Sequence, residues 1–155
     1  VVIPVVLIFM GAGFLFGWAK PVPVDPRFFK HPDKDMMLVA IAGPVSNILI
    51  AIFSLLGLFI VNNLSVGSLM LTMIFKFFFV NGIILNLFLA LFNCIPIPPL
   101  DGSRIIYYFL PSLLKRYYYK VEPFGFFILL SAVYFGLFDG LFSFFEPIYG
   151  MLVKF

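Results

Sequence analysis

Residues 81–102 read NGIILNLFLALFNCIPIPPLDG, an apolar segment that runs into three prolines and ends at one carboxylate, Asp101. Asn86 and Asn93 are seven residues apart, so on a helix they lie on one face and form a polar stripe that leads to the prolines. Proline donates no backbone hydrogen bond and pushes the preceding residue towards extended geometry. We therefore expect a helix that ends near Cys94, followed by a non-helical, proline-rich break.

Asp101 admits two interpretations at this point. Non-helical backbone is tolerated at membrane depth only where it is buried in protein or lines water, and a carboxylate there is costly enough to indicate a functional residue. Alternatively, Asp-Gly-Ser after prolines is an ordinary turn, in which Asp101 would N-cap a short helix over residues 103–110. Composition and spacing do not separate the two.

The composition places the chain in a lipid bilayer. Hydrophobic residues make up 63% of the 155 residues and charged residues only 11%, which leaves too little polar surface to cover a soluble domain. We therefore predict an all-α fold, a multi-pass transmembrane helical bundle in which residues 1–155 form a single membrane-embedded domain. The single histidine, His31, excludes a two-histidine metal motif within the chain, and the single cysteine, Cys94, excludes an internal disulfide.

About four membrane segments are expected from the apolar runs, namely residues 1–16, 36–61, 69–93 and a last stretch over 124–155 that forms one helix or two. Between the proline-rich break and the last stretch, residues 103–121 combine five tyrosines with four Lys or Arg residues. That combination is typical of an amphipathic segment lying in the headgroup region. A nucleic-acid partner is not expected, since these residues lie between apolar runs.

Pro44 and Asn47 interrupt the apolar run over residues 36–61. Pro44 removes one helical hydrogen bond and leaves the carbonyl of Ala40 without its donor, and Asn47 places an amide in the hydrocarbon region. Both groups should therefore face protein. They indicate either a kink with an interhelical hydrogen bond, which is common in membrane bundles, or a role near a functional site.

The distribution of basic residues predicts an orientation in the plasma membrane. Residues 19–35 and residues 103–121 each carry four Lys or Arg, whereas the connection over residues 62–68 carries none. By the positive-inside rule, both basic segments lie towards the cytoplasmic side, and Asp101 lies with them.

Three motifs carry a resemblance to a known family. The pattern N-x-x-P-x-P-P-L-D-G over residues 93–102 resembles the second metal-site motif of the site-2 protease family of intramembrane zinc metalloproteases. A-G-P-x-S-N over residues 42–47 resembles a signature of the same family, and FGWAKPVPVDPRFF over residues 16–29 is similar to a loop of its minimal bacterial branch. The motif H-E-x-x-H, which the family carries on an earlier membrane helix, is absent from these residues.

The resemblance implies a zinc cofactor with Asp101 as one ligand. It also implies that two histidines and a glutamate general base lie upstream, so the chain is expected to be the C-terminal part of a longer metalloprotease core. The implied activity is hydrolysis of peptide bonds in membrane-anchored protein substrates, with Asn47, Asn93 and Pro44 binding substrate or supporting the site.

Two other functions stay open on the sequence alone. The chain could be a non-catalytic membrane relative that binds helices or assists assembly. It could also be a small transporter, because a broken helix with polar groups near mid-membrane is how many solute sites are made. Against the transporter, the sequence shows no inverted repeat.

Overall fold

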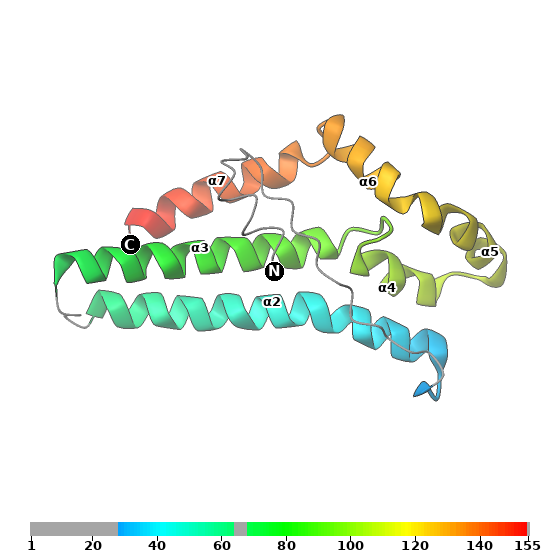
Figure 1. The fold of residues 1–155 in the computed structure, drawn as a ribbon, viewed down its shortest axis with the longest axis horizontal. Helices are drawn as coiled ribbons and strands as arrows, with labels where there is room; N and C mark the ends of the chain where they lie inside the picture. The colour runs from blue at the N-terminus through cyan, green and yellow to red at the C-terminus, as the bar shows by residue number, and fades with distance from the viewer. Residues whose placement is uncertain (1–27, 64–67, 155) are drawn as a thin grey trace, which may run out of the picture.

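A computed structural model of the chain describes residues 28–63 and 68–154, and within these ranges the fold is all-helical, as predicted (Figure 1). The elements run in the order α2 (Pro32–Asn63), α3 (Leu69–Asn93), α4 (Asp101–Phe109), α5 (Ser112–Val121), η2 (Glu122–Phe124), α6 (Gly125–Tyr134) and α7 (Asp139–Lys154). The first expected membrane segment, residues 1–16, lies outside the described residues.

The two longest helices, α2 and α3, form an antiparallel hairpin that is the main body of the structure (Figure 1). α2 has 32 residues, which at about 1.5 Å of rise per residue makes it ~48 Å long. Two acidic residues, Asp33 and Asp35, lie in its first turn, where carboxylates suit the helix dipole. The backbone N–H of His31 donates to the Asp35 carboxylate at 3.0 Å, which closes this end of the helix.

Small residues allow α2 to pack closely on α3. The buried positions of α2 recur every three to seven residues along one face: Ala40, Pro44, Ala51, Ser54, Leu58 and Val61. Those of α3 are Val80, Ile83 and Ala90. Leu58, Val80 and Ile83 form a small shared core. Close approach of small residues is the usual way in which helices associate within a bilayer.

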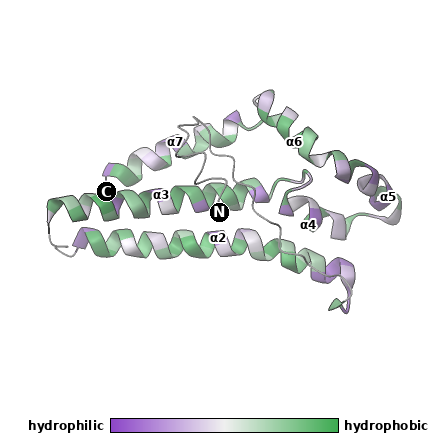
Figure 2. Cartoon of the chain, viewed as in Figure 1, coloured by the Kyte–Doolittle hydropathy of each residue, from purple (hydrophilic) through white to green (hydrophobic). Residues whose placement is uncertain are grey.

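The outward faces of the hairpin are apolar along most of their length (Figure 2). Phe53 and Phe77, for example, are each 68% exposed. A helix that is hydrophobic on all sides is buried in a large core or in a membrane. α2 and α3 are each long and apolar enough to cross a bilayer.

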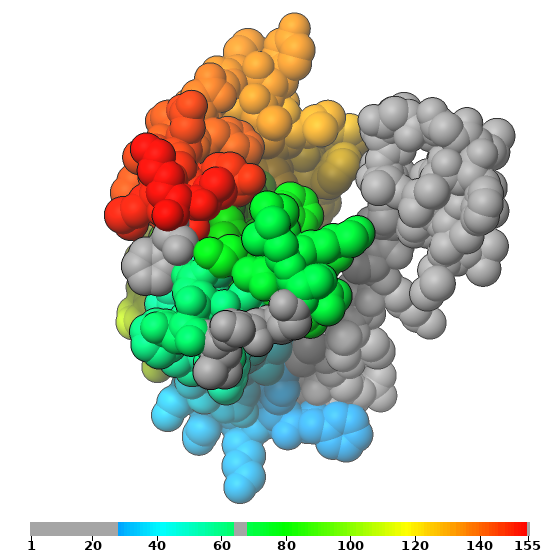
Figure 3. Space-filling view, turned by 90° about the vertical axis from the view of Figure 1, so that its left-hand side faces the viewer, coloured from blue at the N-terminus to red at the C-terminus, as the bar shows by residue number. Residues whose placement is uncertain are grey.

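After α3 the chain folds back over the hairpin. α4 packs along the first half of α2, and α7 packs against α3 (Figure 1). Figure 3 looks from the end where α2 and α3 connect and shows the C-terminal helix α7, in red, stacked on the hairpin. The predicted amphipathic segment over residues 103–121 is present as two amphipathic helices, α4 and α5, because Pro111 interrupts it.

The expectation of about four membrane segments is not confirmed. Within the described ranges, two helices are candidate spans, and α5–α6 with α7 counts as a third only if this pair, bent by 63°, is one span. The last stretch therefore contains two helices, which the sequence left undecided. Gly136 separates them with a φ of 70°, a left-handed conformation that glycine adopts without strain.

Candidate functional site

The proline-rich break connects α3 to α4 as the sequence predicted. α3 ends at Asn93, and the N–H of the next residue, Cys94, bonds back to the carbonyls of Ala90 and Leu91. The chain then turns through short local hydrogen bonds, with the N–H of Leu100 donating to the carbonyl of Ile97 at 2.9 Å. Leu100 is buried, so part of this irregular backbone is enclosed by protein.

The carboxylate of Asp101 lies against α2 at Gly43. A Cβ atom placed on Gly43 would be 2.5 Å from Asp101 Oδ2, so the absence of a side chain there leaves room for the carboxylate. Pro44, the next residue of α2, is buried. The A-G-P-x-S-N motif and the proline-rich motif are far apart in the sequence, and the structure brings them together at this point.

The interpretation of Asp101 as a helix cap is wrong. α4 begins at Asp101, two residues earlier than expected, and its N-cap is Leu100, with no side-chain hydrogen bond at the cap. Asp101 thus belongs to the first turn, where the helix dipole favours a negative charge. Among the residues that the structure describes, none forms a hydrogen bond or ion pair with its carboxylate. The carboxylate is therefore available to a cation.

The surroundings of Asp101 make its charged form costly. The side chain is half-buried, and this desolvation raises the pKa of the Asp101 carboxyl above its ordinary value. The positive charge of Arg104, one turn along α4, lowers the pKa and only partly offsets the effect of burial. A bound cation would offset the remaining cost.

Two further glycines, on α4 and on α6, lie directly against the backbone of the proline-rich break. A Cβ atom on Gly102 would overlap the carbonyl of Cys94 and lie 2.6 Å from the carbonyl oxygen of Ile95. A Cβ atom on Gly125, the first residue of α6, would lie 2.5 Å from the carbonyl oxygen of Pro98. The start of α4 and the start of α6 thus both contact the backbone of the break.

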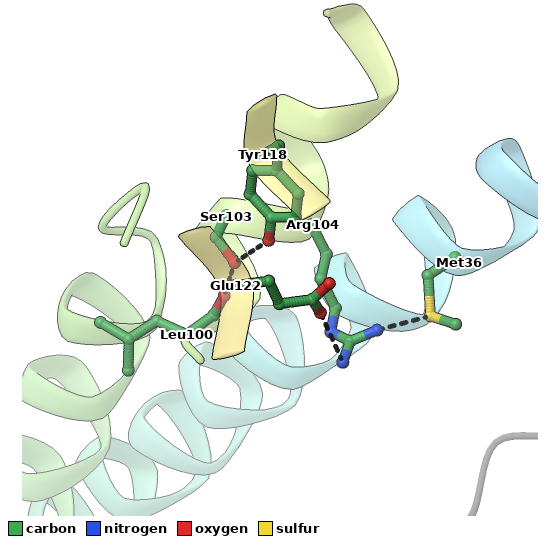
Figure 4. Close-up of polar contacts among 6 residues, drawn as sticks. All are labelled: Met36, Leu100, Ser103, Arg104, Tyr118 and Glu122. Carbon is green, nitrogen blue, oxygen red and sulfur yellow. Dashed lines mark hydrogen bonds and ion pairs between the residues drawn. The ribbon is translucent and has the colours of Figure 1, made fainter. Parts of the chain in front are cut away.

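A pair of hydroxyl groups ties α5 to the start of α4. Ser103 is 2% exposed, and its Oγ donates to the carbonyl oxygen of Leu100 at 2.6 Å. The hydroxyl of Tyr118 on α5 donates to the same Oγ at 2.9 Å (Figure 4). Sequence reasoning missed Ser103, Tyr118 and Gly125 as residues that hold the site, because their partners lie in other elements.

The other predicted site residues lie on the helices that lead to Asp101. Asn47 is half-buried on α2, one turn after Gly43, and Asn93 is the half-buried last residue of α3. Neither side chain forms a hydrogen bond with the described residues, whereas Asn86 donates to the carbonyl of Gly82 in its own helix at 2.8 Å. The roles assigned to Asn47, Asn93 and Pro44 stay predictions.

Known proteins similar to this chain indicate a family. Residues 60–133 match the family described as Peptidase family M50. Over 117 residues, the chain is 44% identical to the Bacillus subtilis (strain 168) protein named "Putative zinc metalloprotease YwhC". The similarity of this chain is to peptidase family M50. No solved structure matches the chain.

The match to M50, the site-2 protease family, confirms the resemblance inferred from the motifs. The matched region contains the proline-rich break, Asp101 and the start of α6. The alignment with the Bacillus subtilis protein covers 74% of this chain and 53% of that protein. The chain therefore spans about half the length of the curated relative that it matches.

The described part of this chain supplies one candidate metal ligand. A catalytic zinc ion takes about three protein ligands and keeps one open position. Within residues 28–63 and 68–154, no group of three or more His, Cys, Asp and Glu side chains could hold a metal ion. His31 and Cys94 are both exposed, and neither forms such a group with Asp101. Asp101 therefore fits a metal as a contributing ligand, while the remaining ligands are not among these residues.

Proposed function

We propose that this chain forms part of an intramembrane zinc metalloprotease that hydrolyses peptide bonds in membrane-anchored proteins, with Asp101 as one zinc ligand. One observation carries the proposal: the half-buried, unpaired carboxylate of Asp101 lies against Gly43 of the A-G-P-x-S-N motif, where the helical hairpin gives way to the proline-rich break. The family and the name of the Bacillus subtilis relative support a zinc-dependent peptidase.

The residues of this chain would place the metal and an extended substrate. Zinc, when bound, supplies the Lewis acidity that activates water and polarises a peptide carbonyl. Asp101 would hold the ion, and Gly43 would leave room for the carboxylate beside α2. Asn47 and Asn93 each offer an amide donor and an amide acceptor, which suits them to the free backbone groups of an unwound substrate helix.

The site would lie towards the cytoplasmic side of the plasma membrane. α4 and α5, which follow the break, carry Arg104, Lys115, Arg116 and Lys120. Lys115 forms an ion pair with Asp33 at the start of α2, so the basic residues of α5 and the first turn of α2 lie at the same end of the hairpin. The positive-inside rule then orients this end to the cytoplasm.

Metal analysis of matched variants tests the assignment. The full-length protein is purified as wild type, as Asp101→Asn and as Glu146→Gln, which removes an exposed carboxylate on α7. We expect about one zinc per chain in the wild type and in Glu146→Gln, and a loss of about 10-fold or more in zinc affinity in Asp101→Asn. Cleavage of a membrane-anchored substrate should fall with the zinc content.

Two outcomes would contradict the proposal. Unchanged zinc and unchanged cleavage in Asp101→Asn would remove Asp101 from the site. A wild-type protein that binds no zinc and cleaves no substrate would favour the non-catalytic membrane relative. The same samples therefore show whether the assignment of Asp101 as a ligand fails or the assignment of a zinc-dependent activity fails.

A further inference from the structure

A second polar feature lies one turn beyond Asp101 on α4 and has no part in the proposed chemistry. It is a cavity of about 240 Å³ between the first turns of α2, the helix α4 and the end of α5. Its polar lining combines both signs of charge with three phenol rings: Asp33, Arg104, Tyr107, Tyr118, Tyr119 and Glu122.

The position of this cavity corresponds to the headgroup region of a bilayer. α2 is ~48 Å long, whereas the hydrocarbon core is ~30 Å thick and the whole bilayer ~40–45 Å. The first turn of α2, which lines the cavity, therefore extends beyond the hydrocarbon. α4 and α5 are amphipathic and carry exposed apolar side chains such as Phe109 (71% exposed) and Leu113 (72% exposed), as expected of helices that lie in this region.

Most N–H donors of the Arg104 guanidinium have no strong acceptor in this cavity. Its Nη1 donates to Met36 Sδ at 3.3 Å, a weak acceptor, and its Nη2 lies 4.0 Å from Glu122 Oε1 (Figure 4). The side chains of this ion pair are 44% and 38% exposed, so the pair is weak and a ligand could replace it. A guanidinium has five N–H donors, most of which are therefore free to bind an anion.

The aromatic wall of the cavity is fixed by contacts among its own members. The ring of Tyr107 lies 5.1 Å from that of Tyr118 and 5.4 Å from that of Tyr119, centroid to centroid. The hydroxyl of Tyr118 is held by Ser103. Lys115 Nζ lies 4.7 Å above the Tyr107 ring and pairs with Asp33. Asp33 is thus already neutralised, which leaves Arg104 and Glu122 as the two charges that a ligand would meet.

We propose that this cavity binds the headgroup of a zwitterionic phospholipid with a primary ammonium, of the phosphatidylethanolamine type. Arg104 would bind the phosphodiester, because the guanidinium fork matches phosphate oxygens. Glu122 would accept hydrogen bonds from the ammonium. The volume is below the ~300–1,000 Å³ of pockets that enclose a whole small molecule, so the headgroup enters while the acyl chains run along the apolar outer faces of the helices.

The neighbouring charges of Arg104 and Glu122 also predict which lipid headgroups bind. A headgroup whose only charge is the phosphate, such as that of phosphatidylglycerol, would place a negative charge beside Glu122 and offer no positive charge to that residue. Phosphatidylcholine has no N–H to donate to the carboxylate. The bound lipid would contact α2, α4 and α5 together and so link the three elements around Asp101. The proposal does not depend on the activity of the site, because it rests on the lining of a separate cavity.

Native mass spectrometry of the full-length protein tests the proposal by titration with each of the three lipids. We expect the wild type to bind phosphatidylethanolamine about 10-fold or more tightly than phosphatidylcholine or phosphatidylglycerol, since one charge-assisted contact accounts for a factor of this size. Arg104→Gln and Glu122→Gln should each remove this preference. Arg116→Gln, which changes an exposed arginine of α5 outside the cavity, should keep it.

The headgroup comparison on the wild type needs no substitution, so it is decisive even if Arg104→Gln does not fold. Equal affinity for the three lipids would overturn the proposal. The same holds if both cavity variants fold and keep the wild-type preference, or if a substrate peptide, and no lipid, protects the cavity residues from chemical labelling.

Discussion

The two ends of this molecule are held together in different ways. In the α2–α3 hairpin, polar side chains bond to carbonyls of their own helix: Ser54 to Ile50 at 2.9 Å, and Asn81 to Phe77 at 2.7 Å. Around the proline-rich break, polar side chains connect different elements, as Tyr118 does with Ser103. The hairpin is thus stabilised by close packing of buried side chains, whereas the end that contains Asp101 depends on specific contacts between elements.

This difference suits the proposed metal site. Helices in lipid associate through close packing of small residues, and a stripe of apolar side chains tolerates small shifts. A metal ligand has to lie within a few tenths of an ångström of its place. Around the break, Gly102 and Gly125 contact backbone atoms and Ser103 is held by hydrogen bonds, whereas the close contacts of Gly57 and Gly82 in the hairpin are with side chains. Substitutions at the two ends should therefore differ in effect.

Gly102→Ala should have the largest effect on stability. The added Cβ would overlap the carbonyl of Cys94, which belongs to the backbone and cannot rotate away. We expect a loss of ~3 kcal/mol in the free energy of unfolding, at the upper end of overpacking effects. Thermal unfolding in lipid nanodiscs measures it. Gly140→Ala is the matched control, because nothing lies within 4 Å of the added atom, and equal losses in the two variants would contradict the role of the close contact.

Gly43→Ala should separate metal binding from folding. The added Cβ would be 2.5 Å from Asp101 Oδ2, the end of a side chain that can rotate. The free energy of unfolding should therefore fall by less than ~1 kcal/mol, while zinc affinity should fall by about 10–100-fold because the ligand is displaced. Competition with a chelator measures the affinity, and Gly150→Ala, in open space, serves as the control. Unchanged zinc affinity would show that the contact with Gly43 does not place the ligand.

Tyr118→Phe should destabilise the same end of the molecule less than Gly102→Ala does. It removes the hydrogen bond to Ser103 Oγ and leaves that hydroxyl bonded to Leu100. We expect a loss of ~1 kcal/mol in the free energy of unfolding. Tyr117→Phe, at a ring that is 65% exposed, should change it very little. Equal values for the two variants would mean that the link between α4 and α5 contributes nothing.

Asn81→Ala should have the smallest effect, at the hairpin. Its Nδ2 bonds only to a carbonyl of its own helix, which already takes part in the helical ladder. We expect a change within about ±0.5 kcal/mol in the free energy of unfolding. A loss as large as that of Gly102→Ala would show that the hairpin too depends on specific polar contacts, and the comparison between the two ends would fail.

The sequence predicts the parts of this fold that depend on local signals. Apolar length and proline placement predict α3 and the break after it, and the observed helix ends at Asn93. Pro111 and Gly136 are equally local signals. Pro111 divides the amphipathic segment into α4 and α5, and Gly136 divides the last stretch into α6 and α7, a division that the sequence analysis left undecided. The proline-rich motif also identifies Asp101 as a candidate functional residue.

The contacts that place Asp101 could not be predicted from the sequence. The approach of Asp101 to Gly43 joins two helices and that of Pro98 to Gly125 joins the break to α6, and no periodicity or spacing specifies which glycine meets which partner. Arg104 carries no sequence signal that distinguishes it from Arg116, yet only Arg104 lines the cavity between α2 and α5. Such pairings depend on how the chain folds back after the break.

A Cβ atom on Gly125 would overlap Pro98, so α6 and the break are in direct contact. The C-terminal pair is bent by 63° and, as a single span, would change its tilt with the thickness of the bilayer. Such a change would move α6 against the backbone that carries Asp101, and membrane thickness would then affect the geometry of the site.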